Sequence, residues 1–153
     1  MKKILITGGA GFIGSAMIRH LIKETEYEVC NIDKLTYASD HRSLSKIEKS
    51  NSYQFYQVDI CIKTDLQKTF NAFKPNIVMH LAAESHVDNS ISSPQEFINT
   101  NILGTYNLLE ISRNYFNDLD KDSQKSFVFH HVSTDEVYGD LENDGSLFNE
   151  KTR

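Results

Sequence analysis

Apolar and polar residues follow two alternating periods along the chain, which predicts strands and helices in strict succession. Short apolar runs predict five strands, at residues 3–7, 28–33, 53–58, 77–81 and 127–133. Between these runs apolar residues recur at helical spacing, for example at Leu66, Phe70 and Phe73. Strands that alternate with helices favour an α/β fold with a doubly wound parallel sheet, a Rossmann-like arrangement.

The remaining segments are predicted from proline and from polar content. A long helix is expected over residues 95–115, with Pro94 well placed for its first turn, and Pro75 ends the helix before it. The polar connection 34–52 predicts one short helix near residues 44–49, whereas 117–125 predicts a surface loop. No repeat or linker divides the sequence, so residues 1–153 are expected to form one domain.

Composition narrows the class of protein. The net charge of −5 and the isoelectric point of about 5.6 argue against binding to nucleic acid or to an anionic membrane. No apolar run is long enough for a membrane span or a signal peptide. Cys30 and Cys61 lack metal-ligand or redox spacing, and no set of histidines and carboxylates has convincing metal spacing. These features predict a soluble, cytoplasmic protein without a metal site.

A glycine turn predicts a dinucleotide site. Gly8, Gly11 and Gly14 follow the first strand and open a helix, which permits a tight turn, close approach of a pyrophosphate and close helix packing. Asp33 ends the second strand, where a carboxylate accepts from a ribose diol and favours NAD over NADP. Asp59 could accept from the adenine amino group. The alternative is a tight turn that binds nothing, with both aspartates capping helices.

Two adjacent carboxylates predict the chemistry. Asp135 and Glu136 follow the fifth strand, at the sheet edge where ligands bind in open α/β sheets. Beside a buried cofactor, one could stay protonated as an acid while the other acts as a base, which suits loss of a proton and of water from one sugar. Thr134 could bond a reacting hydroxyl. The alternative is a helix N-terminus rich in capping residues.

Other polar side chains give weaker indications. Ser85 and His86 follow the fourth strand and could face a substrate, or they could simply cap a loop. His130 and His131 lie within the fifth strand and are expected to have a core or packing role rather than a catalytic one.

Five motifs carry a resemblance to a known family. They are TGGAGFIG at 7–14, DKLTYA at 33–38, HLAAESHVD at 80–88, TNILGT at 100–105 and STDEVYGD at 133–140. With them the chain resembles the extended short-chain dehydrogenase/reductase family, and within it the dTDP-glucose 4,6-dehydratases. It departs from that pattern at Ser39, where glycine is usual, and at Asn89, where arginine is usual.

The resemblance implies a mechanism and a set of site residues. NAD-dependent oxidation at C4 of dTDP-glucose would acidify the C5 proton, water would be eliminated across C5 and C6, and hydride would return to C6 to give a 4-keto-6-deoxy sugar. Glu136 would remove that proton, Asp135 would protonate the departing C6 hydroxyl, and Thr134 and Ser85 would touch the substrate. Besides the three glycines, the implied cofactor contacts are Phe12, Ile13, Asp33, Lys34, Leu35, Thr36, Asp59, Ile60, Leu81, Ala83, Ser85 and Thr100.

The resemblance also sets expectations for the rest of the enzyme. No tyrosine in this sequence has a lysine four residues on, although a Tyr-x-x-x-Lys helix supplies the base for C4 oxidation in this family. The sequence would therefore be an N-terminal part, inactive alone and lacking the substrate domain, of an enzyme that forms a homodimer through the 94–115 helix. Two alternatives remain open, a non-catalytic dinucleotide-binding module and a dehydratase that acts on UDP-glucose.

Overall fold

Five parallel strands form the centre of the molecule in the computed structural model, which describes residues 1–141 and 145–152. The sheet has the order β3-β2-β1-β4-β5, and each neighbouring pair is parallel. The strands are β1 (Lys3–Thr7), β2 (Glu28–Asp33), β3 (Tyr53–Gln57), β4 (Ile77–His80) and β5 (Val128–His131). This topology confirms the predicted doubly wound sheet.

The order of the strands fixes where a ligand can bind. The chain runs outward from β1 to β3 and then returns to place β4 on the other side of β1. Thr7, the last residue of β1, therefore has Ile32 of β2 on one side and His80 of β4 on the other. The connections leaving β1 and β4 diverge at this point, and the crevice outside such a switch in strand order is where open α/β sheets bind ligands.

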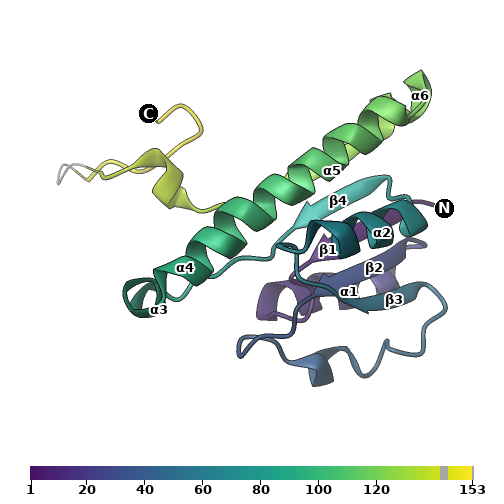
Figure 1. Cartoon of the computed structure of the whole chain (residues 1–153), viewed down its shortest axis with the longest axis horizontal. Coiled ribbons are helices and arrows are strands. Elements are labelled where there is room, and N and C mark those ends of the chain that lie inside the picture. Colours follow the sequence, from purple (N-terminus) through teal and green to yellow (C-terminus); the bar gives the residue numbers. More distant parts are fainter. Residues whose placement is uncertain (142–144, 153) are drawn as a thin grey trace.

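Helices cover both faces of the sheet (Figure 1). On one face α1 (Phe12–Glu24) packs Ile18 and Leu21 against apolar residues of β1 and β2. On the other face α2 (Lys63–Phe73) and α5 (Thr105–Asp118) pack together over a core that includes Phe70 and Leu108, both fully buried. Because β1 has a helix layer on each side, its residues 4–7 are all buried, which explains its uninterrupted apolar sequence.

The predicted long helix is a continuous helical run of residues 94–118 with a π-helical segment inside it. It consists of α4 (Pro94–Phe97), the π-helix η2 (Ile98–Gly104) and α5, preceded by the short α3 (Val87–Ser92). Figure 1 shows this run as a rod that extends beyond the sheet. Pro94 occupies the first turn, as predicted. Gly104 lies against Ile60, where an added Cβ would come within 2.6 Å of the isoleucine side chain.

Two predictions for the connections were wrong. The structure has a 3₁₀ turn, η1 (His41–Leu44), in place of a helix near residues 44–49, because the Asp40 side chain accepts from the Arg42 N–H and starts the turn earlier. The predicted loop 117–125 contains a short helix, α6 (Lys121–Ser126). Asp120 caps it by accepting from the N–H groups of Asp122 and Ser123.

His130 and His131 are not core residues, although the His131 ring lies 5.1 Å from that of His80, which is a packing contact. Both are exposed, and Val128 of the same strand is 49% exposed. β5 pairs with β4 along one side only and is the last strand of the sheet, so its side chains have fewer neighbours than those of β1. Strand β5 is also shorter than predicted, and the chain turns into the 3₁₀ helix η3 (Asp135–Tyr138) soon after it.

Within the described part of the chain, no helix has the length and apolar character needed to cross a membrane.

Candidate cofactor and active site

A cavity of about 450 Å³ opens at the carboxyl edge of the sheet. The glycine turn after β1, the loop after β2, the loop after β4 and the segment after β5 all contribute to its lining. Of the residues predicted to contact a cofactor, those that line the cavity are Gly8, Gly11, Phe12, Ile13, Gly14, Asp33, Lys34, Thr36, Ile60, Leu81, Ala83, Ser85 and Thr100. Leu35 and Asp59 do not line it.

The glycine turn is shaped by close contacts on one side and open space on the other. Gly8 has φ of +73°, and a Cβ there would come within 2.7 Å of the Ala82 backbone nitrogen, so only glycine fits. At Gly11 an added Cβ would meet only the Gly8 carbonyl oxygen, at 3.3 Å, among the described residues. Gly11 also begins α1, for which no side-chain cap and no first-turn acid occur among the described residues. This open, uncapped turn fits the phosphates of a dinucleotide.

Asp33 is held by three hydrogen bonds at the far end of the cavity. One carboxylate oxygen, Oδ2, accepts from the Ala10 N–H at 2.9 Å. The other, Oδ1, accepts from the Leu35 N–H at 2.8 Å and from the Ser39 hydroxyl at 2.9 Å. Leu35 has φ of 61°, a left-handed conformation that accompanies this tight return of its N–H to the preceding carboxylate. Leu35 therefore holds Asp33 through its backbone N–H, and a contact of Leu35 with the cofactor stays a prediction.

A second link ties the loop after β2 to the glycine turn. The carbonyl oxygen of Ala10 accepts from the Asp40 N–H at 2.9 Å, while its N–H donates to Asp33. Ala10 is 1% exposed. The glycine turn is predicted to bind the pyrophosphate and Asp33 to bind the ribose. The backbone of Ala10 thus connects these two parts of the predicted site.

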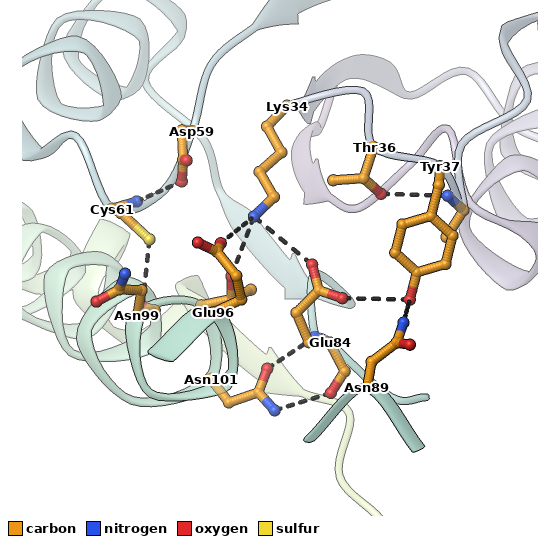
Figure 2. A network of polar contacts seen from close by, with 12 residues as sticks. Lys34, Thr36, Tyr37, Asp59, Cys61, Glu84, Asn89, Glu96, Asn99 and Asn101 are labelled. Carbon is orange, nitrogen blue, oxygen red and sulfur yellow. Dashed lines mark hydrogen bonds and ion pairs between the residues drawn. The ribbon is translucent and has the colours of Figure 1, made fainter. Parts of the chain in front are cut away.

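Lys34 is surrounded by acceptors in a polar network (Figure 2). Its ammonium group lies 3.6 Å from the Glu84 carboxylate and 4.0 Å from that of Glu96. It also donates to the Thr100 hydroxyl at 3.1 Å. The Lys34 and Glu84 side chains are only 24% and 12% exposed, so solvent screens their attraction less than that of a surface pair. The lysine charge is therefore largely compensated within the protein.

The same network crosses between the loops after β2 and β4 (Figure 2). The Tyr37 hydroxyl donates to Glu84 at 3.4 Å and accepts from the Asn89 side-chain amide at 3.0 Å. Asn101, in η2, accepts from the Glu84 N–H at 2.8 Å and donates to the Glu84 carbonyl at 2.9 Å. Glu84 is thus held by both its backbone and its side chain, and it fixes the loop that carries Ala83 and Ser85.

Asp59 makes a local turn contact and does not cap α2, whose N-cap is Ile62. Its Oδ1 accepts from the Cys61 N–H at 2.8 Å, and the Cys61 thiol donates to the Asn99 carbonyl at 3.2 Å (Figure 2). Burial, followed by the hydrogen bond with Asp59, raises the pKa of the Cys61 thiol to about 11. The thiol therefore stays protonated at neutral pH, as its donor role requires. An adenine contact for Asp59 stays a prediction.

A buried histidine lies beneath the cavity. The two ring nitrogens of His80 lie 2.6 Å from the Thr7 hydroxyl and 2.9 Å from the Thr105 hydroxyl. Burial, with a smaller contribution from the nearby His131, lowers the pKa of His80 to about 4. A neutral ring can donate to one threonine and accept from the other. His80 thereby joins the end of β1 to the start of α5.

The predicted catalytic residues lie at and beyond the edge of the cavity. Thr134 lines it, whereas Asp135 and Glu136 are exposed in η3. The Thr134 hydroxyl donates to Glu136 Oε2 at 3.3 Å. The expected pair of carboxylates beside a buried site is therefore not enclosed in this structure. The described C-terminal segment extends away from the strands in Figure 1, and the Tyr138 ring within it stacks on Phe148.

The structure also separates the two candidates of the loop after β4. Ser85 lines the cavity, whereas His86 is exposed at the start of α3 and does not line it. Sequence reasoning missed the roles of Ser39, His80, Glu84 and Asn101. Apart from the contact between Ser39 and Thr36, their partners are 6 to 73 positions away, and no local spacing pattern predicts such contacts.

Comparison with known proteins identifies a family to which this chain is similar. The family model described as GDP-mannose 4,6 dehydratase matches residues 5–153. The dTDP-glucose 4,6-dehydratase of Salmonella typhimurium is 57% identical over 150 residues, covering 98% of this chain and 42% of the relative. The same enzyme from Neisseria meningitidis is 55% identical over 150 residues, again with 98% and 42% covered. The chain spans less than half the length of these curated relatives.

Solved structures of dTDP-glucose 4,6-dehydratases have a similar fold over nearly the whole of this chain. The dTDP-glucose 4,6-dehydratase from Streptomyces venezuelae with NAD bound has a TM-score of 0.83 at 33% identity, over 99% of this chain and 44% of that protein. The corresponding enzyme from Bacillus anthracis in complex with NAD has a TM-score of 0.80 at 32% identity, over 100% of this chain and 44% of that one.

Proposed function

Because the chain belongs to the GDP-mannose 4,6-dehydratase family, we propose that it binds NAD and takes part in the dehydration of dTDP-glucose to a 4-keto-6-deoxy sugar. One observation carries the proposal: a single cavity brings together the glycine turn, Asp33 and Thr134, from three different strand ends. The relatives named dTDP-glucose 4,6-dehydratase support the choice of substrate. In this proposal residues 1–153 form the cofactor domain of a larger protein.

The residues that would hold NAD have distinct tasks. The open turn at Gly11 and the first N–H groups of α1 bind the pyrophosphate. Asp33, 7% exposed, accepts from the ribose. Lys34 is already compensated by Glu84 and Glu96, so it offers little attraction to a 2′-phosphate, which favours NAD over NADP. When bound, NAD would supply reversible hydride transfer: hydride taken from C4 would return to C6 after water is lost, while C5 regains a proton from Glu136, which gives the 4-keto-6-deoxy sugar and restores NAD+.

The residues after β5 would carry the elimination. Thr134 holds the C4 oxygen, and Ser85 contacts the sugar from the loop after β4. Glu136 takes the proton from C5, and Asp135 gives a proton to the C6 hydroxyl, which leaves as water while the C5–C6 double bond forms. Both carboxylates are exposed here, so they act only once substrate and the rest of the protein enclose them.

We further propose that the protein forms a homodimer through the helical run 94–118. That run carries a stripe of exposed apolar residues, namely Ile98, Ile102, Tyr106 and Leu109. They recur every three or four positions, as expected for one face of a helix that packs against a partner. The cytoplasm remains the proposed compartment, and the two free cysteines are compatible with it.

A direct assay tests the function. Full-length protein that contains this chain is incubated with NAD and dTDP-glucose or UDP-glucose, and the 4-keto-6-deoxy product is measured. We expect turnover of the dTDP sugar and a loss of about 10²–10⁴-fold in kcat for Glu136→Gln and Asp135→Asn, the range for removal of a general acid or base. Glu150→Gln, at an exposed position in the same segment, is the matched control.

Two results would contradict the proposal. One is the absence of the keto product with both sugar nucleotides. The other is a Glu136→Gln variant that turns over as fast as the wild type. Turnover of UDP-glucose alone would keep the reaction but correct the substrate.

A further inference from the structure

Ser39 lies between two partners at the ribose end of the cavity. Its hydroxyl donates to Asp33 Oδ1 at 2.9 Å and accepts from the Thr36 N–H at 3.2 Å. The Ser39 N–H donates in turn to the Thr36 carbonyl at 3.0 Å. Ser39 is half-buried and lines the cavity together with Asp33. The hydroxyl is therefore held in one orientation beside the carboxylate predicted to bind the ribose.

The number of acceptor sites left on Asp33 is limited. A carboxylate offers about four lone-pair sites, two on each oxygen. In the described structure, Oδ1 accepts from the Leu35 N–H and the Ser39 hydroxyl, so both of its sites are used. Oδ2 accepts from the Ala10 N–H and keeps one site. Asp33 alone can thus accept one further hydrogen bond without losing a contact that shapes its loop.

Ser39 supplies the second acceptor. A hydroxyl oxygen has one proton and two lone pairs. The proton of Ser39 goes to Asp33 and one lone pair receives the Thr36 N–H, which leaves one lone pair. A ribose diol has two hydroxyl donors and needs two acceptors, and the free sites on Asp33 Oδ2 and Ser39 Oγ match that number.

We propose that Ser39 is a second ribose-binding residue, which accepts a hydrogen bond from one hydroxyl of the adenosine ribose while Asp33 accepts from the other. The inference rests on the proposed binding of NAD and deepens it. It differs from a purely structural role for Ser39, because it ties the effect of the serine hydroxyl to one hydroxyl of the ligand.

Calorimetric titration separates these roles. Full-length protein freed of nucleotide is titrated with NAD, 2′-deoxy-NAD and 3′-deoxy-NAD, in which one adenosine ribose hydroxyl is missing. For Ser39→Ala we expect the Kd for NAD to rise about five- to tenfold, the usual cost of one hydrogen bond to a ligand. For one of the two deoxy analogues the Kd should be the same in variant and wild type. Ser39→Thr, which keeps the hydroxyl, should bind NAD within about twofold of the wild type.

The matched control is Ser43→Ala. That hydroxyl donates to the Asp40 carbonyl in the same connection but does not line the cavity, so its loss should leave all three affinities unchanged. An unchanged NAD affinity in Ser39→Ala overturns the inference, as does an equal loss for NAD and both analogues, which would mean a structural role. Failure of the wild type to bind NAD would instead refute the proposed function, and this inference with it.

Discussion

At the scale of single residues, the charge of Lys34, next to Asp33, bears on the choice between NAD and NADP. A lysine beside a ribose-binding carboxylate would be expected to attract the 2′-phosphate of NADP. Lys34 is prevented from doing so by its position between two carboxylates and the Thr100 hydroxyl. Glu84 is the nearer of the two carboxylates and the more buried. In the proposed site, the choice between NAD and NADP would therefore depend on Glu84, about fifty positions after Asp33.

We predict that Glu84→Gln shifts cofactor preference toward NADP. The substitution keeps the size and the hydrogen-bonding ability of the side chain, but it removes the negative charge 3.6 Å from the lysine ammonium group. The ratio of the Kd for NADP to that for NAD should fall about three- to tenfold, as for a partly screened charge pair. Equilibrium titration of the full-length protein with both nucleotides measures the ratio.

Two further variants sharpen that test. Glu96 lies 4.0 Å from Lys34 and is 61% exposed, so Glu96→Gln should move the ratio less than Glu84→Gln does. In a Lys34→Met background the effect of Glu84→Gln should vanish. If the shift persists without the lysine, the explanation through Lys34 is incorrect.

At the scale of elements, the helical run 94–118 has two faces with different tasks. Thr100, Gly104, Leu108 and Ile111 face the sheet and are buried. The apolar stripe that begins with Ile98 and Ile102 is exposed. The π-helical segment η2 lies where the run passes the cavity. It places Thr100 against Lys34, and it places Asn101 against Glu84 in the polar network (Figure 2). π-helical turns of this kind often occur at functional sites.

We predict that Ile102→Lys breaks the proposed dimer. Ile102 is 64% exposed in the middle of the stripe, so a charge there would be buried at an interface but harmless in a monomer. The free energy of dimerisation should weaken by about 2 kcal/mol or more, a factor of about thirty in Kd. Sedimentation equilibrium of the full-length protein gives this value. Ile62→Lys, at an isoleucine that is 49% exposed at the start of α2, should leave it unchanged; a wild-type monomer would contradict the proposed assembly outright.

The elements also show which parts of the fold were predictable. Strands β1 and β2 have the predicted bounds: β1 contains the unbroken apolar run Ile4–Ile6, as expected for a strand buried on both faces, whereas the apolar residues of β2 are interrupted by the buried Asn31. The π-helical segment was not predicted, because its residues are the same apolar and polar types that an α-helix would use. Helix α6 was missed because its only signal was the cap of Asp120 in a polar stretch.

At the scale of the whole molecule, His80 connects layers that are far apart in the sequence. It belongs to β4, bonds Thr7 of β1 and Thr105 of α5, and lies 5.1 Å, between ring centroids, from His131 of β5. A proton on His80 would be buried without a carboxylate partner in the described structure. Protonation of this ring would therefore disturb the contacts that join β4 to β1 and to α5.

We predict that stability falls between pH 6.5 and 4 because of His80. The pKa of His80 is about 4 in the folded chain and about 6.5 when unfolded, so the unfolded state binds more protons in this window. The free energy of unfolding should decrease as pH falls, by at most about 1.4 kcal/mol per pH unit from this group. Urea unfolding followed by circular dichroism, at several pH values, measures that slope.

Comparison with variants isolates this histidine from the carboxylates. His80→Gln should reduce the slope of the unfolding free energy against pH, between pH 6.5 and 4, by up to the contribution of one proton, about 1.4 kcal/mol per pH unit. His131→Gln removes only the smaller cause of the pKa shift, so its slope should lie between those of His80→Gln and the wild type. A His80→Gln slope equal to that of the wild type would disprove the assignment.

The candidate site was predictable where its residues follow a strand end in a known pattern. The glycine turn and Asp33 belong to that class, since their roles follow from the backbone geometry of a βαβ unit. Glu84 and Asn101 do not, because their importance comes from contacts between loops that only the folded chain brings together. The exposed positions of Asp135 and Glu136 could not be foreseen either, since burial depends on what packs over η3.

Ala10 holds two segments of the candidate site together through its backbone alone. Its peptide N–H and carbonyl join the glycine turn to the loop that carries Asp33 and Asp40, and neither bond uses a side chain. Replacing the alanine by another small residue would leave both bonds in place, so a mutational scan would score the position only for its tight packing. Replacing the amide of Ala10 by an ester, a change in the backbone itself, would remove the N–H that donates to Asp33 and would reveal the link between the two segments. Side-chain substitutions therefore cannot detect this part of the site's hydrogen bonding.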